Sequence, residues 1–157
     1  VLFRSEKGDP GIMTKPPRPP EEPIINRHMQ IGIVIQTIAI TATTLAAFFI
    51  GLSDPIHTHF AETMAFVTLS TSELFRAYTA RSEYYPLLKI GIFTNKWMNY
   101  AILVSLVLIL IVVYVPMLNE PFGTEPLGWL QWVEILPLIL IPSVVAEVTK
   151  YVLSKKA

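Results

Sequence analysis

Two long stretches of the chain contain no Asp, Glu, Lys or Arg. One runs from Met29 to Ser53 and the other from Trp97 to Asn119. Uncharged, mainly apolar runs longer than about 18 residues are typical of helices that cross the ~30 Å hydrocarbon layer of a membrane. A helix on the surface of a soluble protein carries charges along one face instead. The pattern therefore predicts an integral membrane protein.

Two further stretches have the length of a membrane span but a less regular pattern. Residues 60–80 are interrupted by Glu73 and Arg76. Residues 129–152 have a charge-free centre of only 12 residues, Ile135 to Ala146. Hydropathy alone does not decide whether these two stretches cross the membrane.

The last stretch has a second distinguishing feature, which is two internal prolines. Pro137 and Pro142 each remove a backbone donor, so they predict kinks unless neighbouring groups satisfy the freed carbonyls. Trp129 and Trp132 at its start fit the aromatic belt of a membrane interface.

The distribution of basic residues predicts the number of spans. All twelve Lys and Arg residues lie before residue 29, within residues 76–96, or after residue 149. Cytoplasmic segments of membrane proteins carry an excess of Lys and Arg. Four spans place all three basic segments on one side, whereas omitting the second or the fourth would put them on both sides. We therefore predict an all-α, up-down bundle of four transmembrane helices with both termini cytoplasmic. Its spans are expected at about 29–52, 60–80, 97–116 and 129–152.

The first 28 residues are polar and rich in proline. Lys15 to Pro23 reads KPPRPPEEP, a run that favours extended polyproline geometry and blocks helix formation. It is either a flexible tail or a rigid loop that docks on another part of a protein. We expect residues 1–28 to be a cytoplasmic loop, 29–152 a membrane domain and 153–157 a cytoplasmic tail.

Composition and motifs argue against several functional classes. The formal net charge is zero, which argues against a nucleic-acid partner. The chain has no cysteine, no phosphate-cradling glycine loop and no nucleophile paired with a histidine. His57 and His59 stand two apart without an obvious third metal ligand, so we interpret them as interface residues. No catalytic or cofactor-binding residue is expected.

Glu73 carries the strongest functional signal. An ionisable group inside a span is energetically costly and normally faces a protein interior, a water path or an ion. A carboxylate is also the usual ligand of a hard cation such as Ca²⁺. Arg76 shares a helix face with Glu73, so the alternative is that the two neutralise each other. Glu147 and Lys150 have the same spacing near the end of the last span and predict an interfacial ion pair.

Several segments together resemble one protein family. Asp9 to Pro23, DPGIMTKPPRPPEEP, resembles the cytoplasmic loop after the sixth membrane span of P-type cation-transporting ATPases. Glu62 to Glu83 looks like the eighth span, and Lys89 to Tyr100 looks like the start of the ninth. The following turn and the tenth span are matched by Tyr114 to Pro116, Phe122-Gly123-Thr124, and Glu147 to Lys150. The resemblance covers about residues 6–157 and is closest to the calcium-pump branch, including its secretory-pathway type and bacterial relatives.

The resemblance implies that the chain is the C-terminal membrane region of a larger pump. The family couples ATP hydrolysis, through an aspartyl-phosphate, to cation transport, so the parent protein would use ATP and Mg²⁺ and carry Ca²⁺ or another cation. The phosphorylation and nucleotide-binding domains would precede this region, and we expect the fragment to be inactive alone. Its partners would be the lipid bilayer and the missing spans and cytoplasmic domains of the same pump. For a bacterial pump the location would be the plasma (inner) membrane. Val1 to Ser5 does not fit the family's sixth span and is expected to be a foreign or truncated start.

The resemblance also bears on individual residues. The family's eighth span can contribute an acidic ligand to a cation site, and Glu73 occupies the matching position. Arg76 departs from the neutral residue that two-site calcium pumps tend to have, and its charge would disfavour a second cation. Glu73 and Arg76 are therefore either part of an ion site or a structural pair. By resemblance, four residues would brace the membrane region against the catalytic domains: Pro16, Pro17, Arg18 and Pro19.

Two other classes of protein are compatible with parts of the pattern. One is a free-standing four-helix membrane protein, such as an assembly factor or a small carrier. The other is a soluble helical bundle with a proline-rich arm, which the one-sided charge distribution argues against.

Overall fold

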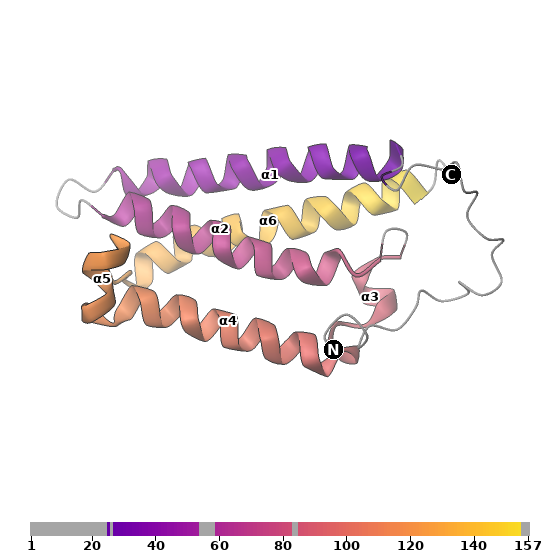
Figure 1. The fold of residues 1–157 in the computed structure, drawn as a ribbon. Helices are drawn as coiled ribbons and strands as arrows, with labels where there is room; N and C mark the ends of the chain where they lie inside the picture. Colours follow the sequence, from indigo (N-terminus) through magenta and orange to yellow (C-terminus); the bar gives the residue numbers. More distant parts are fainter. Residues whose placement is uncertain (1–24, 26, 54–58, 83–84, 155–157) are drawn as a thin grey trace.

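The computed structural model describes residues 25, 27–53, 59–82 and 85–154 (Figure 1). Within these ranges the chain forms helices joined by turns, with no strand. The long helices are α1 (Arg27–Gly51), α2 (Phe60–Thr79), α4 (Lys96–Tyr114) and α6 (Trp129–Ser154). The short ones are α3 (Leu87–Ile90), the 3₁₀ helix η3 (Ile92–Thr94) and α5 (Pro116–Phe122). The predicted all-α class is confirmed.

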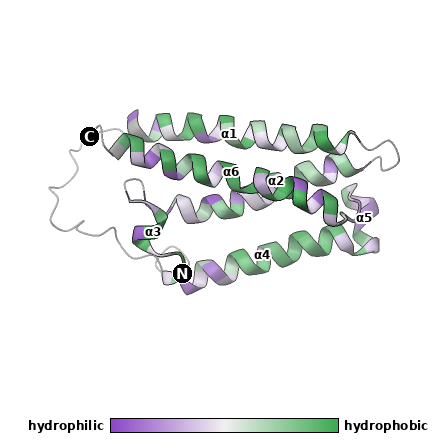
Figure 2. Cartoon of the chain, turned by 180° about the vertical axis from the view of Figure 1, so that it is seen from behind, coloured by the Kyte–Doolittle hydropathy of each residue, from purple (hydrophilic) through white to green (hydrophobic). Residues whose placement is uncertain are grey.

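Three helices in the described part of the chain are long and apolar enough to cross a membrane. They cover Met29–Gly51 in α1, Lys96–Tyr114 in α4 and Trp129–Leu153 in α6. The fourth expected span corresponds to α2, which does not meet this criterion. Figure 2 shows the difference. Helix α4 is hydrophobic over most of its length, whereas hydrophobic and hydrophilic residues are interspersed along α2. Four membrane crossings and two cytoplasmic termini therefore stay predictions.

The low hydropathy of α2 has a structural reason. Helices α1, α2 and α6 pack side by side, and α4 lies along α2 (Figure 1). The face of α2 that is buried in this arrangement includes the hydroxyls of Thr63, Thr68, Thr71 and Ser72. Helices that associate in a bilayer gain little from apolar burial, so their contacts favour small and hydroxyl-bearing residues. The composition of this face of α2 fits a helix that packs against other helices there.

A compact apolar cluster holds the four long helices together at one end of the bundle. Its buried members come from α1, α2, α4, α6 and the turn before α6: Ala47, Phe60, Met64, Val67, Val113, Leu127, Ile135 and Ile139. Gly51 allows a close approach of α1 to α2 there, because a Cβ at this position would lie 2.5 Å from the Cα of Ala61.

Helix α6 continues through both of its prolines as one helix. Neighbouring helices donate to backbone carbonyls in this stretch. Gln36 Nε2 of α1 donates to the carbonyl oxygen of Pro142 at 3.0 Å, and Ser72 Oγ of α2 donates to that of Ile139 at 3.3 Å. These two bonds reach the carbonyls of Ile139 and Pro142, whereas Pro137 and Pro142 free those of Val133 and Leu138, four residues earlier. That neighbours satisfy the freed carbonyls therefore stays a prediction.

The segment between α4 and α6 is held by side-chain hydrogen bonds. The hydroxyl of Tyr114 donates to the carbonyl oxygen of Leu127 at 2.7 Å and accepts from Trp132 Nε1 at 2.6 Å. The hydroxyl of Thr63 accepts from the backbone N–H of Glu125 at 2.9 Å, which ties this segment to the start of α2. The end of the bundle opposite α3 therefore has a fixed connection rather than a loose loop.

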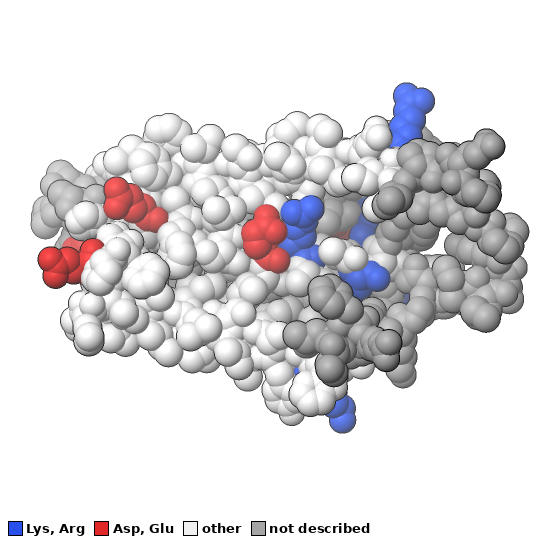
Figure 3. Space-filling view, in the orientation of Figure 1, with Lys and Arg blue, Asp and Glu red and all other residues white. Residues whose placement is uncertain are grey.

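Charge divides the described part of the chain into two ends (Figure 3). The basic end lies where α1 begins and α2 and α6 finish, and it contains Arg27, Arg76, Arg81, Lys89, Lys96 and Lys150. The acidic end contains Glu62, Glu120, Glu125 and Glu134, with no Lys or Arg among its described residues. This is the asymmetry that the sequence pattern predicts for a membrane protein with one cytoplasmic side.

Candidate functional site

Glu73 lies on an exposed side of α2. Its neighbours Thr71 and Ser72 are buried, whereas 46% of the Glu73 side chain is exposed. The Glu73 Oε2 atom lies 3.5 Å from Nη1 of Arg76, whose side chain is 40% exposed. Figure 3 shows acidic and basic groups touching near the middle of this face of the bundle. The Glu73 carboxylate is thus accessible to any molecule or segment that packs on this side of α2.

The Glu73–Arg76 contact is a loose one. Charge-assisted hydrogen bonds between nitrogen and a carboxylate are typically about 2.7–2.9 Å long. At 3.5 Å the guanidinium screens the carboxylate without fixing it. Among the described residues, no group of three or more His, Cys, Asp or Glu side chains could hold a metal ion. A cation bound at Glu73 would therefore need further oxygen ligands that are not part of such a group.

Glu147 and Lys150 form a second charged pair at the basic end of the bundle. Lys150 Nζ lies 3.0 Å from Glu147 Oε1, and the two side chains are 13% and 26% exposed, respectively. Lys150 Nζ also donates to the carbonyl oxygen of Thr79 at the end of α2. Glu147 Oε2 accepts a 2.8 Å hydrogen bond from the backbone N–H of Leu87 at the start of α3. The pair therefore connects α6 to α2 and α3.

Some residues of this end were not singled out by sequence reasoning. The Tyr78 hydroxyl donates to Asn99 Oδ1 at 2.9 Å and links α2 to α4. Arg81, which contributed to the charge map only as a basic residue, donates to the carbonyl oxygen of Gly91 and to Thr94 Oγ1, both at 2.7 Å. Neither pairing has the three- or four-residue spacing that reveals contacts within one helix. Each joins segments that are separated by a turn.

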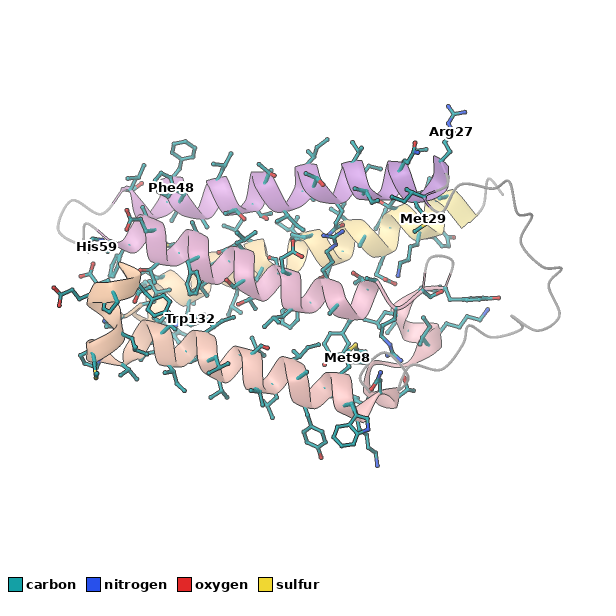
Figure 4. All side chains as sticks on the ribbon, in the orientation of Figure 1. Arg27, Met29, Phe48, His59, Met98 and Trp132 are labelled. Atoms are coloured by element: carbon teal, nitrogen blue, oxygen red, sulfur yellow. The ribbon has the colours of Figure 1, made fainter. Side chains whose placement is uncertain are left out.

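The remaining candidate residues are placed as follows. His59 Nδ1 lies 3.2 Å from Glu62 Oε2 at the start of α2 (Figure 4). His57 lies outside the described residues. The four candidate bracing residues also lie outside them: Pro16, Pro17, Arg18 and Pro19.

Comparison with known proteins gives a consistent result. The chain matches the family described as "Cation transporting ATPase, C-terminus" over residues 1–152. It is 33% identical over 147 residues to "Calcium-transporting ATPase type 2C member 1" of Pongo abelii, covering 94% of this chain and 16% of that protein. It is 30% identical over 165 residues to "Calcium-transporting ATPase 1" of Bacillus cereus, covering 94% of this chain and 18% of that protein. A "Calcium-transporting ATPase 1" of Yarrowia lipolytica is 32% identical over 155 residues, covering 97% of this chain and 16% of the relative.

Proposed function

Because the chain belongs to the C-terminal family of cation-transporting ATPases, we propose that it is the C-terminal membrane module of an ATP-driven calcium pump. The observation that carries the proposal is the match over residues 1–152, together with relatives named as calcium-transporting ATPases. Family membership supports this function over a free-standing four-helix membrane protein. The chain spans 16–18% of the length of these relatives. ATP and Mg²⁺ would therefore act in other parts of the parent protein.

We propose that α2 crosses the membrane together with α1, α4 and α6. Helix α1 ends at the acidic end of the bundle, and α4 begins at the basic end with Lys96. If α1 and α4 both cross, α2 has to return the chain through the membrane between them. The 20 residues of α2 give a length of about 30 Å, which matches the hydrocarbon layer.

The proposed orientation puts the basic end on the cytoplasmic side. Lys and Arg collect at cytoplasmic segments, and the described Lys and Arg residues lie at this end. The cytoplasmic loop, the four-span membrane domain and the short tail expected from the sequence are part of this proposal. In a bacterium the membrane would be the plasma membrane.

For Glu73 we propose a role toward the preceding spans of the pump. An ionised carboxylate inside a membrane span does not face lipid without a large cost, and 46% of the Glu73 side chain is exposed. The exposed face of α2 would therefore meet the preceding spans, where Glu73 would supply one carboxylate oxygen to the transported cation. The loose contact with Arg76 leaves the carboxylate free to do so.

Transport is the direct test of the proposed function. Inverted membrane vesicles from cells that express the full-length protein should accumulate radioactive calcium when ATP is added. Uptake should disappear when the protein is truncated before Arg27, because the four helices would be lost. A stably expressed, full-length protein that moves no divalent cation in the presence of ATP would contradict the proposal.

The crossing of α2 has a separate test, which uses the absence of cysteine from this chain. Single cysteines in place of His59 and Ala80, at the two ends of α2, are introduced into a full-length protein without other cysteines. A membrane-impermeant maleimide should label the His59→Cys protein in intact cells and the Ala80→Cys protein only after lysis. Labelling of both from the same side would show that α2 does not cross.

A further inference from the structure

A pocket of about 220 Å³ opens among α1, α2 and α6 at the basic end of the bundle. Helix α1 lines it with Met29, Gly32 and Gln36, α2 lines it with Arg76, and α6 lines it with Lys150. Figure 4 shows Met29 at this end of α1. The pocket thus joins apolar and polar side chains from three helices that are far apart in the sequence.

The charged groups on the pocket wall are both cations. Glu73 and Glu147, the partners of Arg76 and Lys150, do not line it. A guanidinium carries five N–H donors, so the contact of Arg76 with Glu73 through Nη1 leaves donors for an anion in the pocket. The rest of the wall is largely apolar, with Met29 as an example. The ligand that fits is an anion attached to an apolar body.

Two further features indicate that the described residues leave this space to another molecule. A Cβ added at Gly32 would meet no atom within 4 Å. Glycine inside a helix is destabilising relative to alanine, so packing against the described residues does not explain Gly32. Gln36 is 6% exposed, and its Oε1 has no hydrogen-bond partner among the described residues although its Nε2 is bonded to Pro142.

We propose that this pocket binds the headgroup of an anionic phospholipid of the cytoplasmic leaflet, with the phosphate between Arg76 and Lys150. The inference rests on the proposed function for its orientation, which places the basic end at the cytoplasmic headgroup level. Basic pockets between membrane helices on that side are typical headgroup sites. The apolar wall would accept the start of an acyl chain, and a hydroxyl of the headgroup would donate to Gln36 Oε1.

Native mass spectrometry of the purified full-length protein in detergent tests the site, with phosphatidylglycerol as the probe and phosphatidylcholine as the neutral comparison. The wild type should bind one phosphatidylglycerol in clear preference to phosphatidylcholine. Gly32→Leu should abolish this preference by filling the pocket, whereas Gly32→Ala, its matched control, should keep it. Arg76→Gln should weaken phosphatidylglycerol binding about fivefold and Arg76→Lys should restore most of it. Lys96→Gln removes a charge from the same end but outside the pocket, so it should change nothing.

Other outcomes would overturn the inference. Equal binding of the two lipids, or unchanged phosphatidylglycerol binding in Gly32→Leu, would show that no such site exists. Displacement of the lipid by excess inorganic phosphate would assign the pocket to a free phosphate. A photoreactive residue at Ile33 that cross-links to another span of the same protein would show that protein fills the space.

Calcium transport by the same purified protein, measured after reconstitution into lipid vesicles, separates this inference from the proposed function. Active calcium transport without a lipid preference would contradict the lipid site alone. A selective phosphatidylglycerol site in a protein without ATP-driven transport would contradict the proposed pump function alone.

Discussion

The carboxylate of Glu147 accepts a hydrogen bond from the backbone N–H of Leu87, sixty residues earlier in the chain, at 2.8 Å. Leu87 begins α3, and a helix start has N–H groups without partners in its own helix. The second oxygen of Glu147 faces Lys150 at 3.0 Å, and Lys150 in turn donates to the carbonyl oxygen of Thr79. One side-chain pair therefore fixes the last helix to the end of α2 and to the loop that follows it.

Loss of this carboxylate should destabilise the basic end of the bundle. Glu147→Ala leaves the Leu87 N–H without its acceptor and the Lys150 ammonium with the Thr79 carbonyl alone, at a cost of about 1–3 kcal/mol. Glu147→Gln keeps one acceptor oxygen and should cost less. The measurement is the temperature at which the full-length protein loses its monodisperse peak on size-exclusion chromatography. If both variants lose the peak at the same temperature as the wild type, the contacts of Glu147 do not stabilise the protein.

The two glycines of α1 should respond in opposite directions to alanine. In Gly51→Ala the new Cβ would lie 2.5 Å from the Cα of Ala61, so the backbones of α1 and α2 have to separate. Such overpacking costs about 1–3 kcal/mol. Gly32→Ala meets no atom within 4 Å and should stabilise α1 by about 0.5–1 kcal/mol. The same thermal assay measures both, and destabilisation by Gly32→Ala would contradict the open space at that position.

The hydroxyl of Thr63 should stabilise the acidic end. Thr63 is fully buried and accepts from the backbone N–H of Glu125 while it donates to the carbonyl oxygen of His59. Thr63→Val preserves the shape but removes the acceptor, which should cost about 1 kcal/mol. Thr63→Ser keeps the hydroxyl and serves as the control. Proteolysis from outside right-side-out vesicles should cut the segment before α6 faster in Thr63→Val than in Thr63→Ser, and equal rates would contradict the role.

Glu73 should affect the apparent affinity for calcium. Glu73→Gln removes the charge that the proposed ligand supplies, so calcium-dependent phosphorylation of the full-length pump should require at least about tenfold more calcium, or about 1.4 kcal/mol. Glu62→Gln changes an exposed carboxylate at the other end of the same helix and should leave the affinity unchanged. Unchanged affinity and stoichiometry in Glu73→Gln would rule out the ligand role.

Arg76→Asn separates the ion site from a structural pair. Removing a positive charge next to a cation site should strengthen calcium binding, because the repulsion between the two cations is lost. If the protein instead loses stability while its calcium affinity holds, Glu73 and Arg76 form a structural pair. Calcium-dependent phosphorylation and the thermal assay, carried out on the same preparation, distinguish the two results.

Several parts of the fold followed from the sequence because they depend on local composition. The charge-free runs at 29–53 and 97–119 marked α1 and α4, and the spacing of Glu147 and Lys150 predicted their contact. Helix α2 was harder, because its buried face carries the hydroxyls of Thr63 and Ser72 beside apolar residues such as Met64. Its hydropathy reflects contact with other helices, which is not a property of the segment alone.

The partners of individual side chains did not follow from the sequence. The bond from Gln36 to Pro142 spans 106 residues, and the one from Glu147 to Leu87 spans 60. Pairings of this kind depend on the lateral order and rotation of the helices. Many arrangements of four apolar helices share the same hydropathy profile, so the profile does not select among them.

The sequence by itself determined the all-α class, the positions of the apolar helices and the collection of basic residues at one side, because each depends on the residues of one segment. The tertiary structure decided that Glu73 faces outward from α2, that Glu147 and Lys150 join three helices, and that a pocket with two cations opens among α1, α2 and α6. These features arise from the packing of helices that are distant in the chain, where each contact depends on all the others.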